Sequence, residues 1–134
     1  MPAHFLAALP NFLAYLGTAI VLLVAFIAIY LYVTPYDEIE LIRSNNAAAA
    51  ISLSGALLGF ALPIANVIAH SDTLLDLAVW GAIAGIVQLV AWGVARVALP
   101  QLQEDIAAGR TAPATFVAAL SITVGLLNAA CMTY

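Results

Sequence analysis

Charged side chains are scarce in this sequence, and two residue types are nearly absent. The 134-residue chain contains no lysine, three arginines, seven acidic residues and a single cysteine. The lack of lysine and the formal net charge of −4 exclude a basic nucleic-acid surface and a polybasic lipid-binding tail. The one cysteine, Cys131, excludes an intramolecular disulfide and a thiolate metal cluster within one chain. We expect no nucleic-acid partner, no metal site and no cofactor.

Apolar residues are correspondingly abundant. They make up 66% of the chain, and charged residues 7%, against roughly 45–50% and 25% in an ordinary soluble domain. Four stretches are long enough to cross about 30 Å of hydrocarbon as helices, with the lipid bilayer as their surroundings. They lie at residues 11–33, 47–69, 74–99 and 111–132. The sequence therefore predicts an all-α integral membrane protein, a four-helix bundle forming a single membrane domain over residues 1–134.

The first and third connections between these spans are amphipathic. In residues 36–46 and 101–109, leucine and isoleucine alternate with acids and amides. This pattern suits a short helix lying in the membrane interface. Each segment follows a proline, Pro35 or Pro100, which disfavours helix in the residue before it and so ends the preceding span.

The two halves of the chain, 11–69 and 74–134, resemble each other weakly, with chance composition as the alternative. Both run from a long helix through a proline and an amphipathic link to a helix with a small-residue face. The matching pairs lie about 64 or 65 residues apart: Pro35 and Pro100, Glu40 and Glu104, Ile42 and Ile106, Asn45 and Gly109, Ala48 and Ala112.

The arginines indicate the orientation in the membrane. Arg43, Arg96 and Arg110 all flank the first and third connections, and none flanks the termini or the second connection. Cytoplasmic loops carry the excess of positive charge, so these two connections should be cytoplasmic. With an even number of spans, both termini are then expected to face outward.

Small and weakly polar residues line one face of three predicted spans. Glycines four residues apart let helix backbones approach closely, which supplies much of the packing energy inside a bilayer. These stripes are candidate packing or pore-lining surfaces. They are Ser52, Gly55, Gly59, Pro63 and Asn66 in the second span, Gly81, Gly85 and Gln88 in the third, and Ser121, Gly125 and Asn128 in the fourth.

The spans carry no charged residue between their ends, although proton relays and ion-coupled pumps generally place such groups inside the membrane. Their neutral polar residues are consistent with interhelical hydrogen bonding, at about 0.6 kcal/mol each. The alternative is a polar pore lining. For Asn128 we expect a specific partner: Pro63 leaves a carbonyl near Gly59 without its usual donor, and the Asn128 amide is predicted to supply one, either directly or through one water.

Several long motifs resemble the YjfL-type bacterial inner-membrane proteins, a domain-of-unknown-function family. They are the segments 34–43, 47–63, 80–89 and 125–132, which together extend over nearly the whole chain. The resemblance implies a four-span protein of the bacterial cytoplasmic (inner) membrane with two related halves. Its members are often encoded beside stress-associated membrane proteins of the phage-shock type, which implies an envelope-stress partner. Where the family tends to have Gly-Asn, this chain has Asn45-Asn46, and asparagine tolerates the same left-handed turn.

These observations lead to one functional hypothesis and one rival. The first is a non-enzymatic inner-membrane component that acts through helix-mediated association with itself, as a homo-oligomer, or with an envelope partner. The rival is a channel or transporter subunit with a neutral polar path. That path would be formed by Ser52, Ser54, Asn66, Gln88, Ser121 and Asn128.

Overall fold

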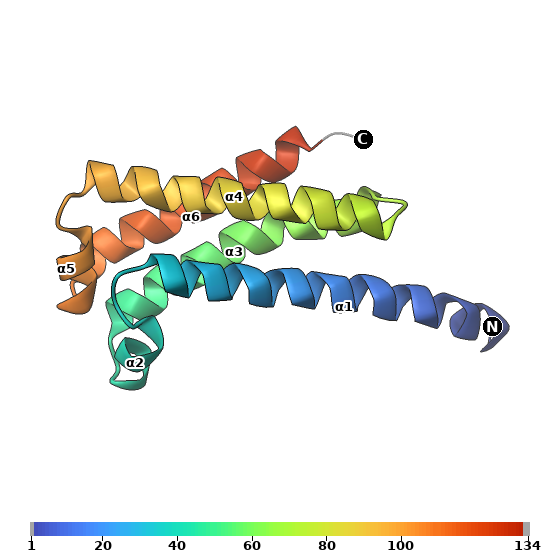
Figure 1. The fold of residues 1–134 in the computed structure, drawn as a ribbon, viewed down its shortest axis with the longest axis horizontal. Helices are drawn as coiled ribbons and strands as arrows, with labels where there is room; N and C mark the ends of the chain where they lie inside the picture. Colours follow the sequence, from blue (N-terminus) through green and yellow to red (C-terminus); the bar gives the residue numbers. More distant parts are fainter. Residues whose placement is uncertain (1, 133–134) are drawn as a thin grey trace.

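The computed structural model describes residues 2–132, all of whose regular elements are helices. Figure 1 shows them in chain order. The elements are α1 (Pro2–Val33), α2 (Glu38–Arg43), α3 (Ala47–His70), α4 (Leu74–Ala98), α5 (Leu102–Ala107) and α6 (Thr111–Cys131). Helices α1, α3, α4 and α6 are long and apolar enough to cross a membrane. The predicted all-α bundle with four spans and two short connecting helices is confirmed.

The first helix begins earlier than predicted. The sequence suggested a start at Asn11, after Pro10, but α1 begins at Pro2 and Pro10 lies inside it. Residues 3–9 are rich in alanine and leucine, which are strong helix formers, and a proline removes only one backbone hydrogen bond. The other predicted bounds agree with the structure to within one or two residues.

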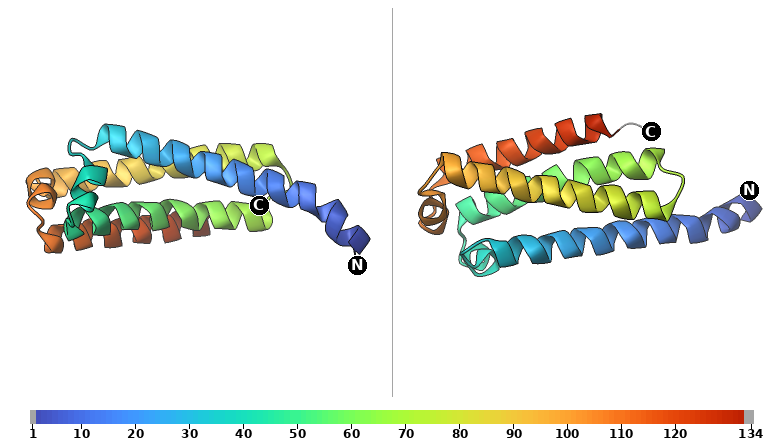
Figure 2. Two further views of the ribbon diagram at one scale, coloured as in Figure 1. Left: turned by 90° about the horizontal axis from the view of Figure 1, so that it is seen from below. Right: turned by 45° about the horizontal axis from the view of Figure 1, so that its top comes forward.

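The four long helices pack unequally. Helices α3 and α6 form the most extensive pair, α4 contacts both, and α1 packs against α4 and α3. The views in Figure 2 place α1 and α6 on opposite sides of the bundle. From residue 6 to its end, α1 has only two buried side chains, Phe26 and Tyr30, so most of this helix faces lipid. The tightest packing is therefore between α3 and α6.

The two short helices lie together at one end of the bundle, and both termini lie toward the other (Figure 1). The halves match closely in this region: α2 and α5 start at residues 38 and 102, and α3 and α6 start at residues 47 and 111, which is 64 residues later in each case. The turns between them use a left-handed backbone, at Asn45 (φ 68°) and Gly109 (φ 83°). The turn expected from Asn45 is thus present.

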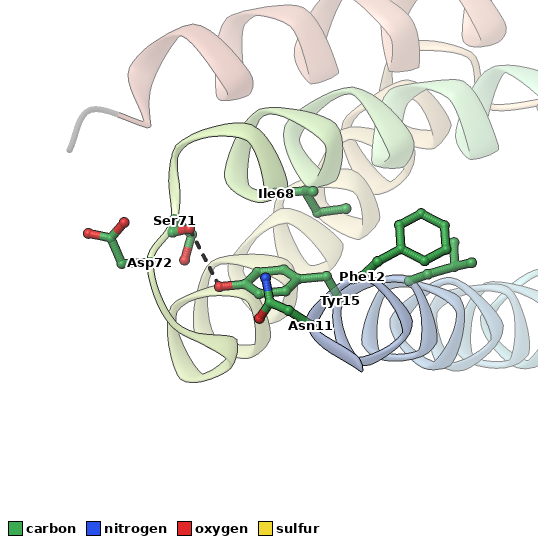
Figure 3. Close-up of a pocket in the computed structure, with 7 residues that line it drawn as sticks. Asn11, Phe12, Tyr15, Ile68, Ser71 and Asp72 are labelled. Carbon is green, nitrogen blue, oxygen red and sulfur yellow. Dashed lines mark hydrogen bonds between the residues drawn. The ribbon is translucent and has the colours of Figure 1, made fainter. Parts of the chain in front are cut away.

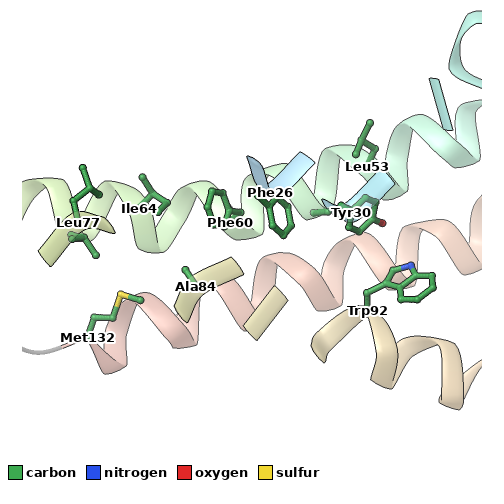
Figure 4. Close-up of a cluster of buried hydrophobic side chains, with 11 residues drawn as sticks. Phe26, Tyr30, Leu53, Phe60, Ile64, Leu77, Ala84, Trp92 and Met132 are labelled. Atoms are coloured by element: carbon green, nitrogen blue, oxygen red, sulfur yellow. The ribbon is translucent and has the colours of Figure 1, made fainter. Parts of the chain in front are cut away.

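Two hydrophobic clusters fill the interior. The larger follows the middle of the bundle, where the ring of Phe26 from α1 stacks on Phe60 from α3 at a centroid distance of 4.5 Å (Figure 4). The smaller lies at the α2 and α5 end and includes the fully buried Leu102 and Ile106 of α5. The short helices are therefore part of the packed structure as well as interfacial segments.

Candidate functional site

The small-residue stripe of α3 lies directly against α6. A methyl group added at Gly55 would overlap the backbone of Ala118, with its carbon 2.5 Å from the Ala118 Cβ. A methyl group at Gly59 would meet the carbonyl of Ser121, and one at Gly125 would meet the carbonyl of Gly59. Helix α6 of the same chain therefore packs against the small-residue stripe of α3.

The two glycines of the α4 stripe differ in their surroundings. A Cβ at Gly81 would lie 2.6 Å from a methyl of Leu22 on α1 and 3.2 Å from one of Ile64 on α3. At Gly85 the nearest atoms are ring carbons of Phe60 and Phe26, at 3.6 and 3.7 Å, which is ordinary contact. A side chain at Gly81 would thus meet only the ends of flexible side chains, which can shift, and one at Gly85 has room, so neither glycine of α4 packs against a backbone as those of α3 do.

The buried amides join helices to one another. The Gln88 side chain is 2% exposed, and its Nε2 donates to the Ser121 carbonyl at 3.0 Å, linking α4 to α6. Asn66 Nδ2 donates to the Ala129 carbonyl at 2.9 Å, linking α3 to α6. Ser52 is fully buried, whereas Ser54 is exposed on the surface of α3. Pro63 is buried within α3.

The direct hydrogen bond predicted for Asn128 is wrong. Its Nδ2 is buried but has no hydrogen-bond partner, and the amide that bridges the two helices is Asn66 on α3. The Gly59 carbonyl, which Pro63 leaves without its usual donor, instead faces the backbone of Gly125. Close backbone contact at these two glycines places Gly125 over the carbonyl that Asn128 was expected to reach.

A buried carboxyl group that the sequence did not lead us to expect lies at the start of α2. Glu38 is 0% exposed, although the amphipathic pattern suggested a solvated acid. The Thr34 hydroxyl lies 2.5 Å from Glu38 Oε1 and 3.3 Å from the Leu31 carbonyl. Pro35 has no N–H to offer that carbonyl, so the Thr34 hydroxyl takes the place of a missing helix hydrogen bond. Asp37 caps α2 by accepting from the Glu40 N–H at 3.2 Å.

Further polar side chains surround Glu38. The Tyr30 hydroxyl lies 3.5 Å from Ser52 Oγ, and both residues are buried. Glu38 Oε2 is buried without a hydrogen-bond partner, and the buried Tyr36 hydroxyl lies close to the side chains of Ser52 and Trp92. Figure 4 shows Tyr30 and Trp92 at the edge of the larger hydrophobic cluster. We call this group the Glu38 cluster; it consists of Tyr30, Thr34, Tyr36, Glu38, Ser52 and Trp92.

Burial governs the electrostatics of this cluster. Loss of solvent raises the pKa of Glu38 to about 7, the Thr34 hydrogen bond opposes the shift and the negative charge of Asp37 adds to it. Burial and the charge of Glu38 together raise the pKa of Tyr36 to about 12. On α4, Arg96 lies over the Trp92 ring at 5.5 Å from its centroid. Among the described residues, no arginine forms an ion pair with Glu38.

The sequence does contain a signal for this site. Glu38 is three residues after Pro35, and a shift of 64 residues aligns it with Leu102, an apolar residue at the start of α5. An acid that aligns with a buried leucine is a candidate buried acid. The burial of Glu38 was not predicted, because the two halves were compared only at positions with similar residues, such as Ile42 and Ile106. Glu38 and Leu102 are dissimilar, so this pair was not considered.

Other hollows lie along α1. A cavity of about 450 Å³ opens at the end opposite α2, between α1 and the connection from α3 to α4. Figure 3 shows Tyr15 within it, donating to the Ser71 carbonyl at 3.5 Å, with Asp72 nearby. Two apolar grooves of about 260 and 180 Å³ flank the middle of α1. Within the described part of the chain, no three histidine, cysteine or acidic side chains gather as a metal site.

These features define a class: a multi-span integral membrane protein built as a helical bundle, with Ser52, Gln88 and Ser121 buried between the helices. The chain belongs to the family described as Domain of Unknown Function (DUF350), which matches residues 4–132. It is 35% identical over 131 residues to the UPF0719 inner membrane protein YjfL of Escherichia coli strain K12, covering 98% of this chain and 99% of that protein.

A second relative comes from a different bacterium. The UPF0719 transmembrane protein YshE of Bacillus subtilis strain 168 is 28% identical over 92 residues, covering 69% of each chain. No solved structure matches the chain. The resemblance to the YjfL-type family is confirmed, and the protein is a multi-pass protein of the bacterial inner membrane.

Proposed function

We propose that this protein is a non-enzymatic component of the inner membrane that acts by associating with a second copy of itself. The glycine stripe of α3 cannot supply that contact, because α6 of the same chain already occupies it. The association must therefore use a face that the chain leaves open to lipid. The observation that carries the proposal is a regular apolar seam on the outer face of α4.

The seam has the spacing of a coiled-coil interface. Its residues recur at alternating intervals of four and three, the repeat with which two helices pack side by side. Apart from one glycine, the side chains are β-branched and exposed, as at Ile86 (62%) and Val90 (59%). A Cβ added at Gly93 would meet nothing within 4 Å, so another backbone can approach there. The seam consists of Val79, Ile83, Ile86, Val90, Gly93 and Val97.

The geometry of a membrane favours a particular dimer. Two copies inserted in the same orientation are related by a two-fold axis along the membrane normal, which brings identical surfaces together. Their α4 helices would then run parallel to each other, with the two seams facing across the axis. The proposed interface is therefore α4 against α4 of the second copy.

Disulfide cross-linking in native membranes tests this interface. Cys131 is exposed, so it is first replaced by serine. Val90→Cys in that background is expected to give a covalent dimer on mild oxidation, because residues at a two-fold axis come within disulfide reach. The matched control is Leu126→Cys on α6, which has a similar exposed fraction (55% against 59%) and lies away from the seam.

The two outcomes are distinct. Strong cross-linking at residue 90 with little at residue 126 supports the dimer. Equal cross-linking at both positions, or none at residue 90, contradicts it. A molecular mass measured in lipid nanodiscs provides an independent check, since the proposal requires a dimer before oxidation.

A channel or transporter subunit is the second candidate. It is favoured by two buried polar atoms that lack partners, Gln88 Oε1 and Asn128 Nδ2. Two observations disfavour it. Ser54 faces outward, and the side-chain amides of Gln88 and Asn66 donate to carbonyls of α6 instead of lining an open path. Selective flux through the purified protein in liposomes would favour this candidate. An envelope-stress protein as the partner, implied only by the family resemblance, is a further proposal for the same exposed faces.

A further inference from the structure

Glu38 occupies a place that leucine fills in the other half of the chain. Helix α2 begins at Glu38 and α5 begins at Leu102, and both side chains are 0% exposed. Leucine therefore satisfies the packing at this point of the repeat. A carboxyl group there must be removed from water, which costs free energy that leucine does not. The acid calls for an explanation other than packing.

The hydrogen bonds of Glu38 fit a protonated carboxyl group. Thr34 has one hydroxyl proton and lies within reach of both Glu38 Oε1 and the Leu31 carbonyl. If Glu38 carries a proton on Oε1, it donates to Thr34, and Thr34 donates to Leu31. If Glu38 is ionised, Thr34 must donate to the carboxylate, and the Leu31 carbonyl, which Pro35 cannot serve, loses that donor. The neutral form alone satisfies the whole chain of bonds.

No nearby charge compensates an ionised Glu38. Its titratable neighbours are Tyr30 of α1 and Tyr36 and Asp37 of the connection, none of which is a cation. Helix α3 contributes Ser52, a neutral residue, and α4 contributes Trp92 with Arg96 over its ring. Oε2 has no partner at all. A buried carboxylate in these surroundings is costly, since neither an ion pair nor a full set of hydrogen bonds offsets its desolvation.

We propose that Glu38 is a proton-binding site that holds α2 against the bundle when protonated and releases it when ionised. Docking of α2 would then respond to pH at the membrane face where the short helices lie. Besides Glu38, the attachment of α2 rests on Leu41 and Ile42, which pack against the buried clusters. Release of α2 would uncover apolar surface at the start of α3. This inference does not depend on the proposed dimer.

The direction of the pH effect follows from proton linkage. Docking raises the pKa of Glu38 from its ordinary 4.5 to about 7, so the docked form binds the proton more tightly than the released form. Docking is then most favourable below about pH 4.5 and weakens by about tenfold per pH unit up to about pH 7. Above that value the proton no longer contributes to docking, and docking does not change further with pH.

Hydrogen exchange measured by mass spectrometry in lipid nanodiscs tests the proposal. Amide protection of residues 38–46 is compared at about pH 5.5 and about pH 8, after correction for intrinsic exchange rates. We expect protection to fall by about tenfold or more at the higher pH. Residues 102–110 are the internal control, because α5 has Leu102 in the equivalent position, and their protection should not change.

The variant Glu38→Gln keeps the shape of the side chain and removes its ionisation. It should protect residues 38–46 equally at both pH values. Glu38→Leu, which copies the residue at the equivalent position of α5, serves as the second variant where the glutamine form does not fold. A wild-type protein without pH dependence in this segment, or a variant that retains the wild-type dependence, would overturn the proposal.

Discussion

Gly55 and Gly85 each belong to a pair of glycines spaced four residues apart, yet they differ in what they contact. At Gly55 the backbone of Ala118 leaves no room for a side chain, whereas at Gly85 two phenylalanine rings stand at ordinary contact distance. The same sequence motif thus marks a required close approach in α3 and a tolerant position in α4. The two positions differ in whether the neighbouring helix leaves room for a Cβ atom.

This difference predicts opposite effects of the same substitution. Gly55→Ala should lower the free energy of unfolding by about 1–3 kcal/mol, because α3 and α6 must move apart. Gly85→Ala should be neutral or stabilising by up to about 1 kcal/mol, because alanine restricts the unfolded chain and favours helix. Unfolding in mixed detergent micelles measures both. Equal destabilisation by the two variants would contradict this account of the packing.

At the scale of elements, the short helices and their turns place α3 and α6. A left-handed residue follows two positions after the end of each short helix, and the long helix begins two residues later. Asn46 then caps α3 by accepting from the Ala49 N–H at 3.0 Å, and its amide donates to the Ile106 carbonyl of α5 at 3.0 Å. The start of α3 is therefore tied to the short helix of the other half.

The backbone of Asn45 yields a second stability prediction. At φ 68°, a β-branched residue is strained while glycine is not. Asn45→Val should destabilise the protein by about 1–3 kcal/mol, and Asn45→Gly should have little effect. Thermal unfolding in detergent compares the two. If the valine variant has the same unfolding temperature as the wild type, the turn does not constrain the start of α3.

At the scale of the whole molecule, the bundle has two unlike ends. The end with α2 and α5 carries all three arginines, and the other carries the termini and the connection with Asp72 (Figure 1). The positive-inside rule assigns the arginine-rich end to the cytoplasm. Glu38 would then respond to cytoplasmic pH.

Cysteine labelling in intact cells tests this orientation. In the Cys131→Ser background, Asp72→Cys is expected to react with a membrane-impermeant maleimide, and Glu104→Cys only after the cells are lysed. Both native side chains are exposed, so a difference in labelling reflects the side of the membrane. The reverse pattern would place both termini in the cytoplasm and Glu38 on the outer side.

The amino-acid sequence by itself determined the elements of this protein. Four spans follow from apolar stretches of sufficient length, the helix ends near Pro35 and Pro100 follow from proline, and the turn at Asn45 follows from its tolerance of positive φ. Each of these depends on a few neighbouring residues and on the bilayer. The start of α1 was missed because several helix formers outweighed one proline.

Only the tertiary structure decided what each face meets. The occupant of the Gly55 stripe, the choice of Asn66 over Asn128 as the bridging amide and the burial of Glu38 all depend on how helices are rotated and shifted against one another. A change in that alignment of one residue turns a side chain by about 100° around its helix. The sequence pattern fixes such alignment poorly in a bilayer, because apolar faces gain little by choosing a protein neighbour over lipid.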